Sequence, residues 1–560
     1  MASAPPVNAA CRLVKAVSHG VGAVLLAGSV ATTAHAVLNV EVTESGKIFL
    51  SADGAGSNDA AGVAIQVDKP NAGATVRSAF LTCAGTSAIG NGQIQLDGTP
   101  ISWDRFVING FFRNVFADVT AVVKPKVDAA APGLVDFQQT ESSIFSTDGC
   151  GLYVIFDDAA QTTDNTVFIL FGGQATGGDS FAIGLAEPLD ASDTAEMGLA
   201  ISFSGQDQSG VGGSNLCGTE SHMDSQIDVN GQRLTSCAGN LDDGVGPVAN
   251  GILITVGGIG DDPANPTDPF QRAADGALPR IIEDELYDLT ALLGPADVLV
   301  VVDTLNPSND DNIFAGHFTI STPAIIGEGV TLSPSSDTNP VGTQHTLTAR
   351  VQDDNGDPVV GKQVTIAVLS GPNAGVSGTG VSDANGEFSL TYTGLGGPGV
   401  DQIQATFVDS QGDTQVSNLV TKEWVMTNEA PDCSQAVPSL DTIWPPNHKF
   451  VPVNIHGVTD PDGDPVVITI DSIFQDEPVD TFGDGKFVPD GQGIGTDTAD
   501  VRAERSGTPD VPGNGRVYHI GYTVDDGQGG SCSGEVTVAV PHDQTTAPVD
   551  DGALYDSTVP

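Results

Sequence analysis

The chain has 560 residues, with 20 Lys and Arg against 72 Asp and Glu and a formal net charge of −52. So large an acidic excess argues against nucleic acid or an anionic lipid surface as the partner. The 69 Gly and 34 Pro, with charged residues at only 16%, are typical of turn-rich β structure. We therefore expect an all-β, multidomain protein built from antiparallel β-sandwiches with Ig-like modules.

Residues 1–36 are organised as an export signal. Arg12 and Lys15 precede a short apolar run, and an Ala-x-Ala site predicts cleavage after Ala36. The run is well short of the ~20 residues that a membrane-spanning helix needs. Losing these two basic residues changes the net charge from −52 to −54. We expect a secreted or surface-held monomer without a membrane span, whose charge serves solubility and self-repulsion or binds cations in acidic turns.

The largest region repeats two sequence elements. The segment 93–98 returns as 226–231, each a strand followed by an Asp-Gly or Asn-Gly turn. The segment 116–123 returns as 286–293, each with an Asp-apolar-Thr core. The preserved order favours a duplication over chance similarity. We predict two β-sandwich units, residues 37–195 and 196–326, with the second a possible duplication of the first.

Several strands of this region are apolar without interruption, as in Leu152 to Phe156 and Val298 to Val302. Such strands are typical of a sheet that is covered on both faces. The region resembles the large β-sandwich region that precedes Ig-like repeats in some secreted bacterial surface proteins. This resemblance implies no particular activity.

Residues 329–424 alternate apolar and polar residues between Asn-Gly and Asp-Pro turns, which predicts a small antiparallel sandwich. One turn reads Asp353-x-x-Gly-Asp-Pro-Val-x-Gly-x-x-Val, and a later one reads Asp383-x-Asn-Gly-x-Phe. Both turns, in this order, resemble the group 1 bacterial Ig-like domain of invasin- and intimin-type adhesins. That resemblance implies a stalk or spacer and no chemistry.

Residues 429–543 form the last predicted module, with strands at 450–455, 466–470, 517–524 and 535–540 in an Ig-like pattern. A Trp-Pro-Pro-Asn-His-Lys segment at 444–449 and a Val-Arg-Ala-Glu-Arg-Ser-Gly segment at 501–507 resemble a recurrent C-terminal module of secreted bacterial proteins. The resemblance implies no function. Residues 544–560 are polar and without a strand pattern, so we expect a disordered tail.

Six cysteines remain in the mature chain, an even number that favours disulfides in an exported protein. Cys433 and Cys532 alone lie in the last module and are predicted to pair with each other. Proximity in the sequence favours the pairs Cys217–Cys237 and Cys83–Cys150.

We expect no catalytic residues and no cofactor-binding residues, since the sequence holds no hydrolase elbow, no His-Glu-x-x-His and no phosphate-binding loop. The 72 acidic residues guarantee many accidental carboxylate pairs, so none is assigned to glycan hydrolysis. The best chemical signal is Asp460, Asp462 and Asp464, whose alternate spacing in a tight turn fits a calcium ion. The alternative is that Asp and Gly simply make turns.

The sequence therefore predicts a non-catalytic adhesion or structural spacer protein. Its ligand would be a cell-surface, matrix or glycan molecule, and calcium the one cofactor. The alternative is a carbohydrate-binding or glycan-hydrolysing N-terminal region displayed on an Ig-like stalk.

Overall fold

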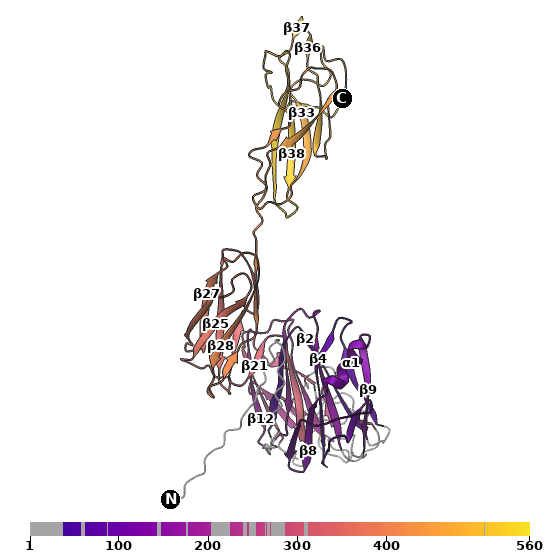
Figure 1. The fold of residues 1–560 in the computed structure, drawn as a ribbon, viewed down its shortest axis with the longest axis vertical. Helices are drawn as coiled ribbons and strands as arrows, with labels where there is room; N and C mark the ends of the chain where they lie inside the picture. Colours follow the sequence, from indigo (N-terminus) through magenta and orange to yellow (C-terminus); the bar gives the residue numbers. More distant parts are fainter. Residues whose placement is uncertain are drawn as a thin grey trace. The chain divides into compact units, whose positions relative to one another are not determined.

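A computed structural model describes residues 37–560 with gaps at 58–61, 87, 143–146, 175–176, 203–224, 239–243, 246–253, 262, 264, 266–268, 270–285, 307–311 and 509. The expected signal at 1–36 therefore lies outside the described residues. The chain divides into two compact units, 1–425 and 426–560 (Figure 1). Both are built almost entirely of antiparallel β-sheets, which confirms the predicted fold class.

The first sandwich has an outer and an inner sheet. The outer sheet runs in the order β3 (Val63–Lys69), β9 (Gly133–Glu141), β5 (Ile94–Leu96), β6 (Thr99–Pro100). The inner sheet runs β2 (Ile48–Ser57), β10 (Gly149–Asp157), β4 (Thr75–Gly85), β8 (Phe112–Asp118), with β16 (Gly244–Val245) and β7 (Arg105–Asn109) at its edges.

The second sandwich repeats this order. Its inner sheet runs β11 (Asn165–Phe171), β20 (Asn312–Ile320), β13 (Ala195–Ser202), β18 (Leu286–Asp288), joined by β1 (Asn39–Gly46) and β17 (Ile254–Val256). Its outer sheet runs β12 (Asp179–Leu185), β19 (Leu299–Leu305), β14 (Ser225–Val229), β15 (Gln232–Ala238), joined by β21 (Ala324–Ile326). In both sandwiches the eight core strands follow the double Greek-key order of a jelly roll.

The repeated sequence elements occupy equivalent places in the two rolls. Asp97 and Asn230 each begin a two-residue hairpin turn in the outer sheet, with φ of 48° and 49°. The predicted boundary at 195/196 is wrong, because β11 and β12 already belong to the second roll. Pairing between strands that are distant in the sequence leaves no local signal, so composition did not reveal the boundary near residue 160.

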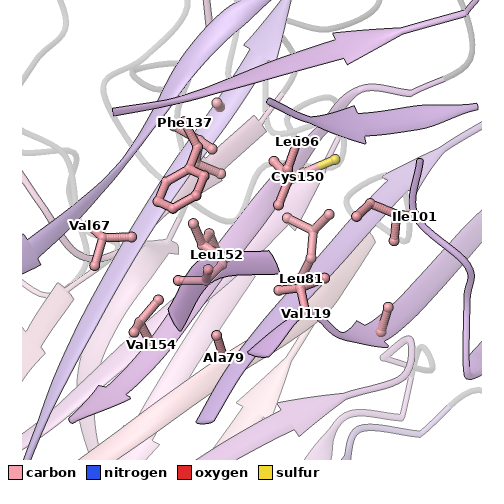
Figure 2. Packing of buried hydrophobic residues seen from close by; sticks show 14 of the residues in the cluster. Val67, Ala79, Leu81, Leu96, Ile101, Val119, Phe137, Cys150, Leu152 and Val154 are labelled. Atoms are coloured by element: carbon pink, nitrogen blue, oxygen red, sulfur yellow. The ribbon is translucent and has the colours of Figure 1, made fainter. Parts of the chain in front are cut away.

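The four sheets stack face to face around three apolar cores. Along β10, Leu152 and Val154 face the core of the first roll, whereas Tyr153 and Ile155 face the core between the two inner sheets. The double covering of β10 confirms the reason given above for its uninterrupted apolar run. The same expectation is wrong for Val298 to Val302, because β19 belongs to an outer sheet and its buried and half-buried residues alternate. Figure 2 shows the core of the first roll, where Leu152 lies among side chains from β3, β4, β5 and β9.

Helix α1 (Thr120–Ala129) follows β8 and was not foreseen from the sequence. Val123 and Val127 are the buried residues of the helix and pack into the core of the first roll. At its start, the Asp118 carboxylate accepts a hydrogen bond from Thr120 N at 2.9 Å. Lys69 is buried, and its Nζ donates to three carbonyls at the end of the helix, those of Val127, Asp128 and Ala130, at 3.0–3.1 Å. A buried lysine thus caps the helix C-terminus, where a positive charge is favourable.

An Ig-like sandwich completes the first unit. One sheet runs β22 (Gly329–Ser333), β24 (Gln344–Gln352), β27 (Glu387–Thr393). The other runs β23 (Ser336–Pro340), β30 (Val420–Val425), β28 (Gly399–Val408), β25 (Gln363–Ser370), β26 (Ser377–Val381), with β29 (Thr414–Val416) beside β28. The second strand β23 pairs in parallel with the last strand β30, an arrangement found in Ig-like sandwiches.

The second unit is also an Ig-like sandwich. One sheet runs β31 (Val437–Pro438), β32 (Phe450–His456), β35 (Thr498–Arg502), β34 (Gly491–Gln492). The other runs β39 (Ser531–Val540), β38 (Arg516–Asp525), β33 (Val467–Gln475), β40 (Tyr555–Asp556). A small hairpin joins β36 (Gly507–Thr508) to β37 (Val511–Pro512). The predicted strands of this module are confirmed.

The expected disorder of residues 544–560 is wrong. This segment, here called the C-terminal strap, lies on the module and contributes β40 to its sheet. Leu554 N donates to Gln475 O at 3.0 Å, and Ser557 N donates to Ile473 O at 2.9 Å. The strap lacks an alternating pattern because backbone and carboxylate hydrogen bonds, more than apolar side chains, hold it in place. The module therefore extends past the predicted end at 543.

Candidate functional site

The predicted calcium turn brings its three acids together. One carboxylate oxygen from each of Asp460, Asp462 and Asp464 lies within 4.8 Å of the other two, the one such metal-compatible group among the described residues. Asp460 Oδ1 accepts hydrogen bonds from the backbone N of Asp462 at 2.9 Å and of Asp464 at 3.1 Å. Asp462 Oδ2 accepts from Glu429 N at 2.6 Å. Oxygen ligands of this kind suit a hard cation.

The same turn occurs without an acidic triplet elsewhere. In four further turns an Asp Oδ1 accepts from the backbone N two and four residues later; these begin at Asp353, Asp383, Asp409 and Asp526. Each has a glycine of positive φ at the fourth position, where a residue with a Cβ would be strained. The turn at Asp460 therefore has a structural reason for its first Asp and for Gly463. An acid at the fifth position recurs in three of the other turns, so Asp462 at the third position is the acid that distinguishes this turn.

One oxygen in this turn has no such explanation. Asp460 Oδ2 is buried and makes no hydrogen bond within the described part of the chain. A buried carboxylate oxygen without a donor is unfavourable. The site thus fits the predicted calcium ion, and calcium binding stays a prediction.

The prediction for calcium is a small, specific stabilisation. For a site of about 10⁻³ M affinity, 10 mM calcium would stabilise the folded module by about 1.4 kcal/mol, or about 5 °C in Tm. Scanning calorimetry of the mature chain with calcium or chelator measures this shift. Asp462→Asn is expected to abolish it, whereas Asn355→Ala, at the same place in the turn at Asp353, leaves it intact. Equal melting in calcium and chelator means that the acidic turn is only a turn.

A second, larger cluster lies inside the C-terminal module and was not foreseen. Arg516 is fully buried on β38, and its Nη1 donates to Asp490 Oδ2 at 2.6 Å. Its guanidinium also lies 3.3 Å from Glu477, 3.7 Å from Asp484 and 3.6 Å from Glu504. These five side chains form the charged hub. Arg502 Nε lies 3.6 Å from Asp490 and 3.9 Å from Glu504, so four acids face two arginines. The remaining excess of negative charge is unfavourable because the cluster is buried.

A shared proton relieves part of this excess. Burial, followed by the hydrogen bond to Asp490, holds the pKa of Glu504 well above its usual range. The raised pKa favours the neutral form of Glu504, whose O–H can donate to the Asp490 carboxylate. Such a pair keeps two buried carboxyl groups in contact without two full charges.

The hub connects to the two sequence segments that distinguish this module. His448, in the Trp-Pro-Pro-Asn-His-Lys segment, has φ 64°, and its Nδ1 lies 3.1 Å from Glu504 Oε2. Arg502 donates to His448 O at 2.9 Å and stacks over the Phe450 ring at 4.2 Å. The two segments thus meet at the hub. Their occurrence together in one module is the feature of the sequence that could have indicated the hub. With 72 acids present, residue type alone did not identify the buried ones.

The Ig-like domain of the first unit has its own buried acid. Asp401 is fully buried on β28 and accepts from Asn373 N and Nδ2 at 2.8 Å each, Tyr392 OH at 3.0 Å and Trp424 Nε1 at 2.7 Å. Four donors satisfy the carboxylate and fix two core aromatics, so Asp401 organises the fold rather than a reaction.

Two buried or half-buried carboxylates in the described part of the jelly rolls have structural partners. Burial raises the pKa of Asp179 to about 6, although its Oδ2 accepts from Leu38 N. Burial also raises the pKa of Asp53 to about 7, while the carboxylate accepts from the backbone N of Gln66 on β3. Because β3 is an edge strand, Asp53 satisfies a backbone group that no neighbouring strand reaches.

A pocket in this region lies on helix α1. It is lined by Asp118, Thr120, Ala121, Lys124, Pro125 and Asp128. Its two acids are engaged, Asp118 with Thr120 N and Asp128 with Lys124 Nζ at 2.9 Å. The pocket therefore presents a helix surface rather than a pair of acids facing a substrate.

Two of the three predicted disulfides are confirmed. Cys83 and Cys150 are directly opposed on β4 and β10 and are bonded, as are Cys433 and Cys532, which are 99 residues apart. Cys217 and the side chain of Cys237 lie outside the described residues, so this pair stays a prediction.

Comparisons with known proteins add little to this description. No protein-family model matches the chain, and no curated protein is found to be similar to it. Among solved structures, one of the fibronectin(III)-like modules of Clostridium thermocellum CbhA is similar at 16% identity, covering 38% of this chain and 94% of that chain. Its TM-score of 0.14 is too low to support an argument.

The sheets themselves define the class, a multidomain all-β protein of jelly-roll and Ig-like sandwiches. In the described part of the chain, no helix combines the length and the apolar character needed to cross a membrane.

Proposed function

We propose that the protein is a secreted or cell-surface adhesion and spacer protein without catalytic activity. The observation that carries this proposal is the use of the buried charges. Lys69 caps a helix, Asp401 holds core aromatics, and Arg516 neutralises a buried acidic cluster. Each has a structural partner, whereas a catalytic acid or base would face a substrate.

The Ig-like domain at 329–424 supports the finer assignment to the group 1 bacterial Ig-like type. The two turns that carry the resemblance begin at Asp353 and Asp383, and both have the same side-chain cap and a left-handed glycine. The motif residues therefore specify hairpin geometry. Such a domain would hold the jelly rolls away from a surface, and the rolls would contact a cell-surface, matrix or glycan ligand.

The alternative is a glycan-binding or glycan-hydrolysing activity of the jelly rolls. The jelly-roll fold favours it, since lectin domains share this strand order. The engaged acids in the pocket beside α1 favour the spacer.

The first test separates binding from turnover. The mature chain is expected to bind a subset of cells or arrayed glycans saturably, and to leave polysaccharide, ester and peptide substrates intact. Binding is measured by flow cytometry and glycan array, and turnover by product analysis over one day. Product formation that persists through a second purification and follows the protein peak would overturn the non-catalytic assignment.

A further inference from the structure

We propose that the C-terminal strap is a pH-gated latch, held on the outer face of β38 by the protonated form of His519. The strap contacts the module along its length. Val549 N donates to Asn514 O at 3.1 Å, and Asn514 Nδ2 donates to Asp551 Oδ2 at 2.9 Å. It therefore runs against the module before it adds β40 at the edge of β33.

His519 links the strap to the sheet through both ring nitrogens. Nδ1 lies 2.8 Å from Glu535 Oε1 on β39, and Nε2 lies 3.0 Å from Asp550 Oδ1 in the strap. An ionised carboxylate only accepts hydrogen bonds, so both nitrogens must donate, and only the imidazolium carries two N–H groups. The docked strap therefore requires a charged histidine.

The other groups near the ring are acidic or do not titrate. Phe474 on β33 and Thr537 on β39 are its strand neighbours, and neither titrates. Asp476 directly follows the end of β33 and accepts a hydrogen bond from Asp551 N at 3.4 Å. Burial raises the pKa of Asp476. Asp556 lies opposite Phe474 on β40. Within the described residues, no lysine or arginine forms an ion pair with Glu535 or Asp550, so His519 is the cation that offsets these two acids.

The direction of the pH dependence follows from these contacts. Burial lowers the pKa of His519, but the hydrogen bonds that its ring donates to Glu535 and Asp550 outweigh burial and leave the pKa raised above 6.5. Because the pKa of His519 is raised in the docked state, the contribution of this contact is complete when the pH is below the ordinary pKa of histidine. It is lost as the pH rises through the pKa that His519 has in the docked state. Burial raises the pKa of Asp550, but the hydrogen bonds that its carboxylate accepts from Gly552 N and His519 outweigh burial and leave the pKa lowered. At much lower pH this carboxylate takes up a proton, and the latch weakens again.

Release of the strap would open the charged hub. The backbone carbonyl of Ser557 accepts from Asp490 N at 2.9 Å and from Gly491 N at 2.7 Å. Asp490 is the acid that contacts Arg516 at 2.6 Å. Undocking the strap therefore leaves two backbone N–H groups unpaired next to the hub and uncovers the edge of β33.

Hydrogen exchange by mass spectrometry on the mature chain tests the latch. Protection factors of peptides within 549–558 are compared between pH 6 and pH 9, which removes the intrinsic pH dependence of exchange. One charge-assisted hydrogen bond predicts a fall in protection of about tenfold or more from pH 6 to pH 9. His519→Gln is expected to show weak protection at both pH values, whereas His456→Gln, at an exposed histidine of the same module, behaves as the wild type.

Asp550→Asn provides a second variant that changes only the strap. Peptides of β38 should stay protected in it, and the pH dependence of the strap should be reduced. The latch is overturned by a pH dependence that is the same in His519→Gln and the wild type, or by a strap that is unprotected at both pH values.

Discussion

Replacing Arg516 with Met is expected to lower the stability of the C-terminal module by about 3–5 kcal/mol. Methionine fills similar space but cannot neutralise the acids around it. Glu477, 3.3 Å away, would be left as a buried carboxylate without a cation. Asp490 would lose its 2.6 Å contact and keep only Arg502, at 3.6 Å. Peptide-level hydrogen exchange across 426–560 measures the loss as faster exchange of the core strands.

Two comparisons separate charge from packing. Lys449→Met removes a positive charge from an exposed site of the same module and should cost under about 0.5 kcal/mol. The penalty of Arg516→Met should be smaller at pH 5 than at pH 8, because protonation relieves the uncompensated acids. A cost of under about 1 kcal/mol, or one that does not depend on pH, would mean that Arg516 contributes by packing alone.

The local pattern of the sequence predicted the strands and the Ig-like sandwiches. Strands such as β24 and β25 alternate apolar and polar residues because one face is more deeply buried than the other, and that period is visible in a short window of sequence. The disulfides were predicted from proximity and from the small choice within each domain. Where neighbours in the sequence determine the structure, prediction from the sequence succeeded.

The remaining features depend on contacts between distant segments. The boundary between the jelly rolls was missed because β11 pairs with β20 and β1 joins the sheet of the second roll. The strap was missed because a two-residue strand and side-chain hydrogen bonds leave no periodicity. The charged hub was missed because its acids resemble the turn acids in type, and only the fold separates a buried Asp490 from an exposed Asp462.

Replacing Asp401 with Ala is expected to destabilise the Ig-like domain of the first unit by about 3–5 kcal/mol. The substitution leaves buried donors on Asn373, Tyr392 and Trp424 without an acceptor. An unpaired buried donor costs about 1–3 kcal/mol, and relaxation toward water reduces the sum. Trp424 Nε1, with the shortest of these bonds at 2.7 Å, should lose its fixed position, so its fluorescence should shift toward the red before the domain unfolds.

Matched variants show whether the carboxylate itself is responsible. Tyr392→Phe removes one donor and leaves three, so we expect a cost of about 1 kcal/mol. Asp413→Ala removes an exposed acid of the same domain and should change stability by under about 0.5 kcal/mol. Denaturant titrations followed by hydrogen exchange of peptides within 329–424 give all three values. If Asp401→Ala costs no more than Asp413→Ala, the buried acid does not hold the aromatics, and their mutual packing at 5.7 Å between ring centroids suffices to position them.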